Sequence, residues 1–163
     1  MSNRDNTHAS ILLDASGSMN NIWYDTLAGI NLFLADQKTQ PGTLTVSLST
    51  FNSRYRPYIT FGDISSVELN PLRDVYPQAR TALYDAIHSQ AEAVQIGIAG
   101  LNPRDRPSKV LCFVVTDGME NQSNRYNARD TKKLVDLCWQ VQPQHAGHHE
   151  GVDGKLTGNK LDP

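Results

Sequence analysis

The sequence predicts a doubly wound α/β domain, in which a mostly parallel, Rossmann-like sheet is covered by helices on both faces. Short apolar, strand-like runs alternate along the chain with segments of helical period, which is the pattern of such sheets. The chain has 163 residues, of which 39% are hydrophobic and 20% charged, and this length and composition suit one globular domain.

Four runs are predicted to be strands. The apolar runs at 9–14 and 110–115 are typical of strands covered on both faces, whereas the alternation over 44–51 indicates a half-buried strand. The run at 55–61 follows a short turn and is expected to pair with its predecessor as an antiparallel hairpin. Pro57 confines this last strand to an edge of the sheet, because proline cannot donate a ladder hydrogen bond.

Three helices are expected between and after these strands. The first, at about 20–38, carries an inner stripe of Trp23, Leu27, Ile30 and Leu34. The second covers about 82–100, with the Thr81 hydroxyl as its cap, and its apolar repeat comprises Leu83, Ile87, Ala91, Val94, Ile98 and Leu101. The third ends near 141 and begins at Asn127, a cap residue with Asp130 three positions on.

The remaining segments have no clear period. Residues 63–80 contain two prolines and are predicted to be an irregular connection. Residues 142–163 have four scattered apolar residues among Gly, His and Pro, so we expect a polar, disordered tail after a domain at 1–141.

Composition also argues against several classes of protein. The 15 Lys and Arg residues nearly balance the 17 Asp and Glu residues, without the basic stripe that nucleic-acid binding needs. No apolar run is long enough to span a membrane, and residues 1–8 do not resemble a secretion signal, so a cytoplasmic, membrane-free protein is expected. Cys112 and Cys138 lack metal-motif spacing and are interpreted as buried thiols.

Five oxygen-bearing side chains are predicted to converge at one edge of the sheet. They follow the first strand, precede the second long helix and follow the strand at 110–115, and parallel strands bring their carboxyl ends to the same edge. Two carboxylates and three hydroxyls suit a hard cation, Mg²⁺ or Mn²⁺, rather than Zn²⁺ or Cu²⁺. The predicted ligands are Asp14, Ser16, Ser18, Thr81 and Asp117.

Alternation in the loop Asp14-Ala-Ser16-Gly-Ser18 would point its three oxygen ligands the same way, with Gly17 allowing the backbone to bend. Each motif alone also suits a plain turn or helix cap. Glu120 and Asn121 are interpreted as solvated or turn residues beside Asp117, and Asp85 as an exposed residue or a support for the site.

Together the motifs Asp14-Ala-Ser-Gly-Ser-Met19, Thr81-Ala-Leu-Tyr-Asp85 and Val114-Val-Thr-Asp-Gly118 resemble the metal-ion-dependent adhesion site (MIDAS) of von Willebrand factor A domains. The resemblance covers about residues 1–141 and is similar to stand-alone bacterial members. It implies that the five oxygen-bearing residues ligate a metal directly or through water. Compared with the usual six-stranded sheet, the last strands are expected to be missing, and Arg80 stands where members often have a small residue.

The resemblance implies a binding module, not an enzyme, that holds Mg²⁺ or Mn²⁺ and engages an acidic residue of a partner protein. Two alternatives stay open: a Mg²⁺-dependent hydrolase or phosphoesterase with Asp14 as nucleophile, and a truncated, non-functional fragment. Because no strand is expected after residue 141, strand 110–115 is predicted to expose an edge through which copies self-associate or a partner adds a strand.

Overall fold

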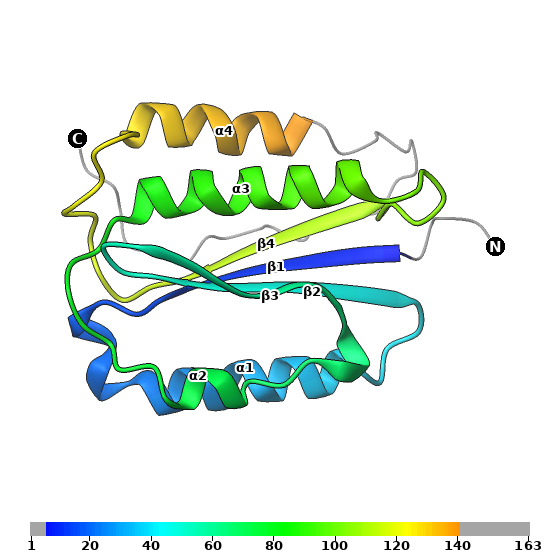
Figure 1. Cartoon of the computed structure of the whole chain (residues 1–163), viewed down its shortest axis with the longest axis horizontal. Coiled ribbons are helices and arrows are strands. Elements are labelled where there is room, and N and C mark those ends of the chain that lie inside the picture. The colour runs from blue at the N-terminus through cyan, green and yellow to red at the C-terminus, as the bar shows by residue number, and fades with distance from the viewer. Residues whose placement is uncertain (1–5, 141–163) are drawn as a thin grey trace, which may run out of the picture.

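The computed structural model describes residues 6–140 and contains a four-stranded sheet in the order β3-β2-β1-β4 (Figure 1). β1 (Asn6–Asp14) pairs in parallel with β2 (Thr43–Phe51) and with β4 (Lys109–Val115), while β3 (Tyr55–Asp63) pairs antiparallel with β2. The predicted fold class, including the edge hairpin, is confirmed. The predicted tail at 142–163 lies outside the described residues.

Helices cover both faces of the sheet (Figure 1). On one face lie α1 (Trp23–Gln37) and the short α2 (Asn70–Arg73), and on the other lie α3 (Leu83–Gly100) and α4 (Ala128–Gln140). The four residues of the predicted stripe on α1 are all buried, and they form the larger core together with the inward side chains of β1 and β2. The α1 face is thus the better-packed side of the sheet.

The connection at 63–80 is more ordered than the sequence suggested. It contains a 3-10 turn, η3 (Ile64–Ser66), and then α2, and its apolar residues Val67, Leu69 and Leu72 are buried in the core. Trp23 lies beneath it and donates a hydrogen bond of 3.1 Å from Nε1 to the Leu72 carbonyl. The apolar residues are too few and too irregularly spaced to reveal a period, which is why the sequence predicts only an irregular connection here.

The inner face of α3 also differs from the prediction. Ala86, Gln90 and Val94 are buried, whereas Leu83 and Ile87 are only half-buried. Gln90 is accommodated because its amide donates to Ser10 Oγ and its oxygen accepts from Tyr55 Oη at 2.7 Å. An apolar period cannot reveal a buried glutamine, since its burial depends on partners from two strands.

The strand β4 is the last strand of the sheet within residues 6–140, and it is less covered than its composition indicated. Phe113 and Val114 are 37% and 42% exposed, and Cys112 is exposed too, so its interpretation as a buried thiol is wrong. The reason is position, because this edge strand pairs only with β1 among the described strands. The side chain of Cys138 lies outside the described residues.

None of the helices within residues 6–140 is long and apolar enough to cross a membrane.

Near the start of β1, the inaccessible His8 ring stacks on Phe61, with ring centroids 3.9 Å apart. Its Nδ1 lies 2.8 Å from Thr45 Oγ1, and burial lowers the pKa of His8 to about 4. The folded chain therefore keeps His8 neutral through mildly acidic pH.

This burial predicts an acid-dependent loss of stability. In the unfolded chain His8 is protonated below about pH 6.5, whereas in the folded chain it is protonated only below about pH 4. The free energy of unfolding should therefore fall as the pH drops through this window, by up to about 1.4 kcal/mol per pH unit. Urea unfolding of the parent and of His8→Gln between pH 7 and 4 measures this contribution of His8. The free energy of unfolding should change less steeply with pH in the variant than in the parent. Parallel curves would contradict the assignment.

The position of β4 at the edge of the sheet within residues 6–140 leads to a proposal about assembly. No charge or proline interrupts residues 110–115, so the edge can accept a strand from a second copy. We expect concentration-dependent dimers in size-exclusion chromatography with light scattering, and a Val114→Lys variant should remain monomeric because a lysine on an edge strand disfavours pairing with a second strand. A monomer at all concentrations, with slow amide exchange over 110–115, would show that the edge is already covered.

Candidate metal site

The candidate site lies where β1 and β4 end side by side and α3 begins, at the left of Figure 1. The pairing of Leu13 with Val115 is the last in the parallel register, so the residues that follow each strand leave the sheet together. This is the crevice outside the strand ends where doubly wound sheets bind ligands. The topology therefore brings Asp14 and Asp117 to one place.

Asp14 is completely buried, and both of its carboxylate oxygens accept hydrogen bonds. Oδ1 accepts from the backbone N–H of Ser16 at 2.7 Å, and Oδ2 accepts from the Thr116 hydroxyl at 2.6 Å. The carboxylate thus connects the loop after β1 with the loop after β4. The sequence analysis did not single out Thr116, although this residue belongs to the motif that contains Asp117.

Two serines and Asp117 continue this chain of oxygens. Ser16 Oγ lies 3.2 Å from Ser18 Oγ, and the Ser18 hydroxyl donates to Asp117 Oδ1 at 2.7 Å. The loop is not extended as expected, because Ser16 caps a 3-10 helix, η2 (Gly17–Asn21), whose first turn holds Ser18. Nor does Gly17 adopt a left-handed conformation, and a Cβ there would meet only ordinary contacts.

Thr81 completes the set of five predicted residues, and the position of Gly118 shows how close the oxygens lie. A Cβ built on Gly118 would stand 3.4 Å from Thr81 Oγ1, 3.5 Å from Ser18 Oγ and 3.6 Å from Asp14 Oδ2. Three oxygens, two from the end of β1 and the loop after it and one from the segment before α3, therefore surround one point that no side chain occupies. The structure brings together all five residues that the sequence singled out.

Asn121 holds Thr81 in place through two backbone contacts. The Asn121 side-chain oxygen accepts from the Thr81 N–H, and the Asn121 N–H donates to the Thr81 carbonyl, both at 3.0 Å. The prediction that the Thr81 hydroxyl caps α3 is wrong, since the cap residue is Ala82, whose side chain makes no hydrogen bond to the helix. The hydroxyl instead faces the oxygen cluster.

Two carboxylates fasten the loop after β4 to the first turn of α3. Glu120 accepts from the backbone N–H groups of Tyr84, Gln122 and Ser123, and Asp85 accepts from those of Asn124, Arg125 and Tyr126. Burial opposes the ionisation of Glu120, but the hydrogen bonds from Ser123, Tyr84 and Gln122 outweigh it and hold its pKa below the ordinary value. Of the two sequence interpretations of Glu120, a solvated or a turn residue, the structure supports the turn residue, because Glu120 is half-buried and accepts from Gln122 and Ser123.

The chemistry of the cluster suits a hard divalent cation. The buried Asp14 carboxylate has no Lys, Arg or His ion-pair partner among residues 6–140, although buried charges in proteins are generally paired or coordinate a metal. No group of three or more His, Cys, Asp or Glu side chains in the described part could hold a metal. The mixed carboxylate and hydroxyl cluster is thus the candidate metal site, and its donors are all oxygen.

Comparison with known proteins gives a likeness of fold. No family model matches the chain, and no curated protein matches it. A structure of proximal thread matrix protein 1 from the mussel byssus, described with a zinc-occupied MIDAS motif, superposes with a TM-score of 0.55 and 18% identity over 83% of this chain and 34% of that chain. A second structure of that protein gives a TM-score of 0.57 with 16% identity and the same coverage.

A D319A mutant of the PilB minor pilin from Streptococcus sanguinis is also similar, with a TM-score of 0.51 and 16% identity over 69% of this chain and 30% of that chain. The chain thus spans about a third of the length of these proteins. At such identities the likeness establishes the fold, which fits that of a von Willebrand factor A domain.

The two hydrogen bonds between Asn121 and the Thr81 backbone give a prediction about metal affinity. Replacing Asn121 by alanine removes the acceptor for the Thr81 N–H, so the Thr81 hydroxyl should lose its fixed position. We expect about a tenfold to hundredfold weaker affinity for Mn²⁺ by calorimetric titration, the usual effect of removing a group that orients a metal ligand.

Asn124→Ala is the matched control, because only the backbone of Asn124 contributes to the loop contacts. It should bind Mn²⁺ like the parent. Equal affinities in all three proteins would show that Asn121 does not support the site.

Proposed function

We propose that the chain is a metal-dependent binding module that holds Mg²⁺ or Mn²⁺ through Asp14, Ser16, Ser18, Thr81 and Asp117 and engages an acidic residue of a partner protein. The observation that carries the proposal is the buried Asp14 carboxylate, which has no Lys, Arg or His ion-pair partner within residues 6–140 and lies beside the converging hydroxyls of Ser18 and Thr81. An ion at this point would supply the missing positive charge. It would also replace the Ser18 to Asp117 hydrogen bond as the connection between the two loops.

Charge explains why an acidic partner is expected. Two carboxylates neutralise a divalent cation only formally, and neutral hydroxyls supply the other protein ligands, so the ion keeps an affinity for one more anionic oxygen. Asp117 and Ser18 are exposed, whereas Asp14, Ser16 and Thr81 are buried. The buried residues would fix the ion from below, and the exposed side would leave it accessible to a partner.

A hydrolase with Asp14 as nucleophile is less well supported. A nucleophilic carboxylate needs a free oxygen that can approach its substrate, but Asp14 is inaccessible and both of its oxygens accept hydrogen bonds. The solved structures of similar fold are described as a matrix protein and a pilin, which supports a binding role. Phosphatase and nucleotidase activity is therefore not part of the proposal.

Metal binding should be visible in the thermal stability of the chain. Mg²⁺ or Mn²⁺ at millimolar concentration should raise the melting temperature, because a ligand that binds only the folded state stabilises it by mass action. Asp117→Ala should abolish the rise while leaving the metal-free melting temperature near that of the parent, since Asp117 is exposed. Zn²⁺ belongs in the same titration because the similar matrix protein holds zinc.

Two further variants separate loss of the site from loss of the fold. Gly118→Ala adds only a methyl group in ordinary contact with three of the ligand oxygens, so it should preserve the fold but crowd the ion. Asp25→Ala removes an exposed carboxylate on α1 and should keep the full response to metal. A rise of equal size in Asp117→Ala and the parent would exclude the proposed site.

A further inference from the structure

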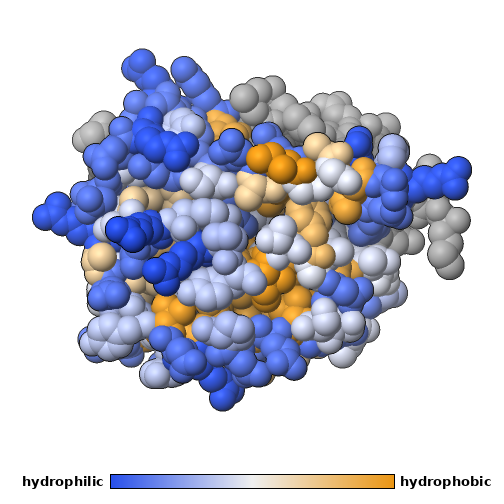
Figure 2. Space-filling view, viewed as in Figure 1, coloured by the Kyte–Doolittle hydropathy of each residue, from blue (hydrophilic) through white to orange (hydrophobic). Residues whose placement is uncertain are grey.

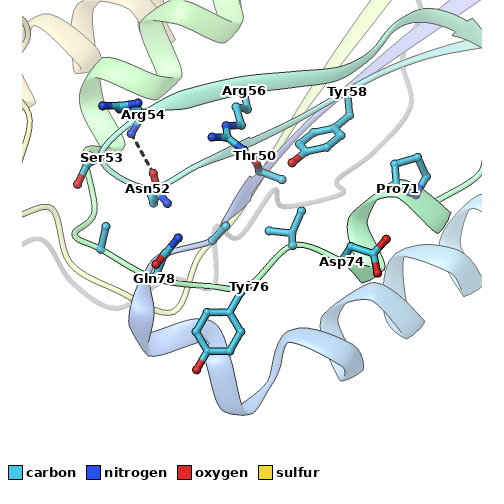
Figure 3. A pocket seen from close by; sticks show the side chains of 13 residues that line it. Thr50, Asn52, Ser53, Arg54, Arg56, Tyr58, Pro71, Asp74, Tyr76 and Gln78 are labelled. Carbon is cyan, nitrogen blue, oxygen red and sulfur yellow. Dashed lines mark hydrogen bonds between the residues drawn. The ribbon is translucent and has the colours of Figure 1, made fainter.

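An open pocket of about 520 Å³ lies beside the metal site, between the start of β3 and the segment that follows α2 (Figure 3). Its lining includes Arg54, Arg56 and Tyr58 on the β3 side, and Asp74, Tyr76 and Gln78 on the other side. The pocket is large enough for one or two amino-acid side chains. Nothing in the metal site itself requires such a pocket.

A wall of backbone separates the pocket from the oxygen cluster. Ala15, which lines the pocket, stands between Asp14 and Ser16, and its carbonyl accepts from the Gln78 N–H at 2.9 Å. Ala79 also lines the pocket, and its carbonyl accepts from the Gly17 N–H at 3.1 Å. Ala15 and Ala79 have small side chains, so a peptide lying on the metal can continue past them into the pocket.

The charges in the pocket favour an anion. The guanidinium groups of Arg54 and Arg56 are exposed and form no ion pair or hydrogen bond with any residue in 6–140. Asp74 is the one acidic residue in the lining, so the two arginines outweigh it.

Of the two arginines, Arg56 is the better placed to bind an anion inside the pocket. Figure 3 shows Arg56 and Tyr58 projecting from β3 into the pocket, with Arg54 at its end near Asn52 and Ser53. Tyr58 is half-buried and packs against the core, so it forms a firm wall beside Arg56. On the same face of the molecule, hydrophilic residues border an apolar patch (Figure 2). An arginine beside an apolar wall binds a carboxylate better than one in open water, because less solvent competes.

We infer that the pocket is a second recognition site for the partner, which binds a second carboxylate of the same peptide segment through Arg56, with Arg54 in support. The inference rests on the proposed function, in which a first carboxylate caps the metal. The partner segment would then be acidic and extended, with two carboxylate residues separated by a few positions, since an extended chain advances about 3.3 Å per residue. A free amino acid or another small zwitterion would use Arg56 and Asp74 together, and the experiment distinguishes this case.

The test uses fluorescein-labelled, acetylated Gly-Ser peptides that carry one Asp, or two Asp residues separated by one to four positions. Fluorescence anisotropy with the parent chain in Mg²⁺ should show one spacing that binds about tenfold more tightly than the single-Asp peptide, the gain expected from one charge-assisted Arg–carboxylate contact. Chelation of Mg²⁺ should weaken every peptide. Arg56→Gln should remove the gain of the second Asp and leave both the single-Asp affinity and the metal-induced rise in melting temperature unchanged.

Two control variants test whether position or overall charge is responsible. Arg104→Gln removes an exposed arginine in the loop before β4, at the opposite end of the sheet, and should keep the full gain. Asp74→Asn should strengthen binding of the two-Asp peptide, because it removes the competing negative charge of the pocket. If Asp74→Asn instead weakened binding, the pocket would be selecting a zwitterionic ligand and the inference would be wrong.

The remaining outcomes separate the two proposals. Metal-dependent binding of the single-Asp peptide without a gain at any spacing would overturn the second site and leave the metal-dependent function intact. Binding of no peptide by a chain whose melting temperature rises with Mg²⁺ would overturn both the acidic partner and the second site. An equal loss of gain in Arg56→Gln and Arg104→Gln would show that overall charge, not the pocket, attracts the peptide.

Discussion

The site and the loops around it depend on the buried carboxylate of Asp14. Its two oxygens bind the Ser16 N–H and the Thr116 hydroxyl, so a single side chain fixes the loops after β1 and β4 relative to each other. A buried anion without a basic partner is costly for an isolated chain, and the cost diminishes only when hydrogen bonds or a cation compensate it. The hydrogen bonds are present in the structure, and the hydroxyls of Ser18 and Thr81 lie where a cation would complete the compensation.

Support for the oxygen cluster extends beyond the residues that would touch an ion. Asn121 fixes Thr81 through the backbone. Glu120 and Asp85 accept hydrogen bonds from six backbone N–H groups, one at the start of α3 and five in the loop after β4. These carboxylates lie at the beginning of α3, where the helix dipole favours negative charge. The loop after β4 is therefore held to α3 by hydrogen bonds and by the stacking of Tyr126 on His88, and it depends on the helix that directly follows Thr81.

The sequence predicted a mostly parallel sheet with one antiparallel hairpin, the edge position of β3 and the gathering of the five oxygen-bearing residues. These features follow from alternation, from Pro57 and from the rule that parallel strands end at one edge, all of which are visible in a linear sequence. It did not predict the burial of Gln90, the exposure of Cys112 or the contacts of Glu120. Each of these depends on which segments meet in space, and side-chain type alone carries no such information. The 3-10 turn at Ser18 was missed for a related reason, since short turns lack a period.

The central place of β1 has a mechanical consequence. β1 pairs along its length with β2 on one side and with β4 on the other, and Asp14 is its last residue. A partner attached through an ion at Asp14 would pull on β1 nearly along the strand direction. The ladders on both sides would then be loaded in shear, so that many hydrogen bonds resist together instead of opening one after another. An attachment point at the end of an interior strand would thus resist a pulling force through two ladders at once. The same ion held by an edge strand would be resisted by one ladder, from which the strand could peel.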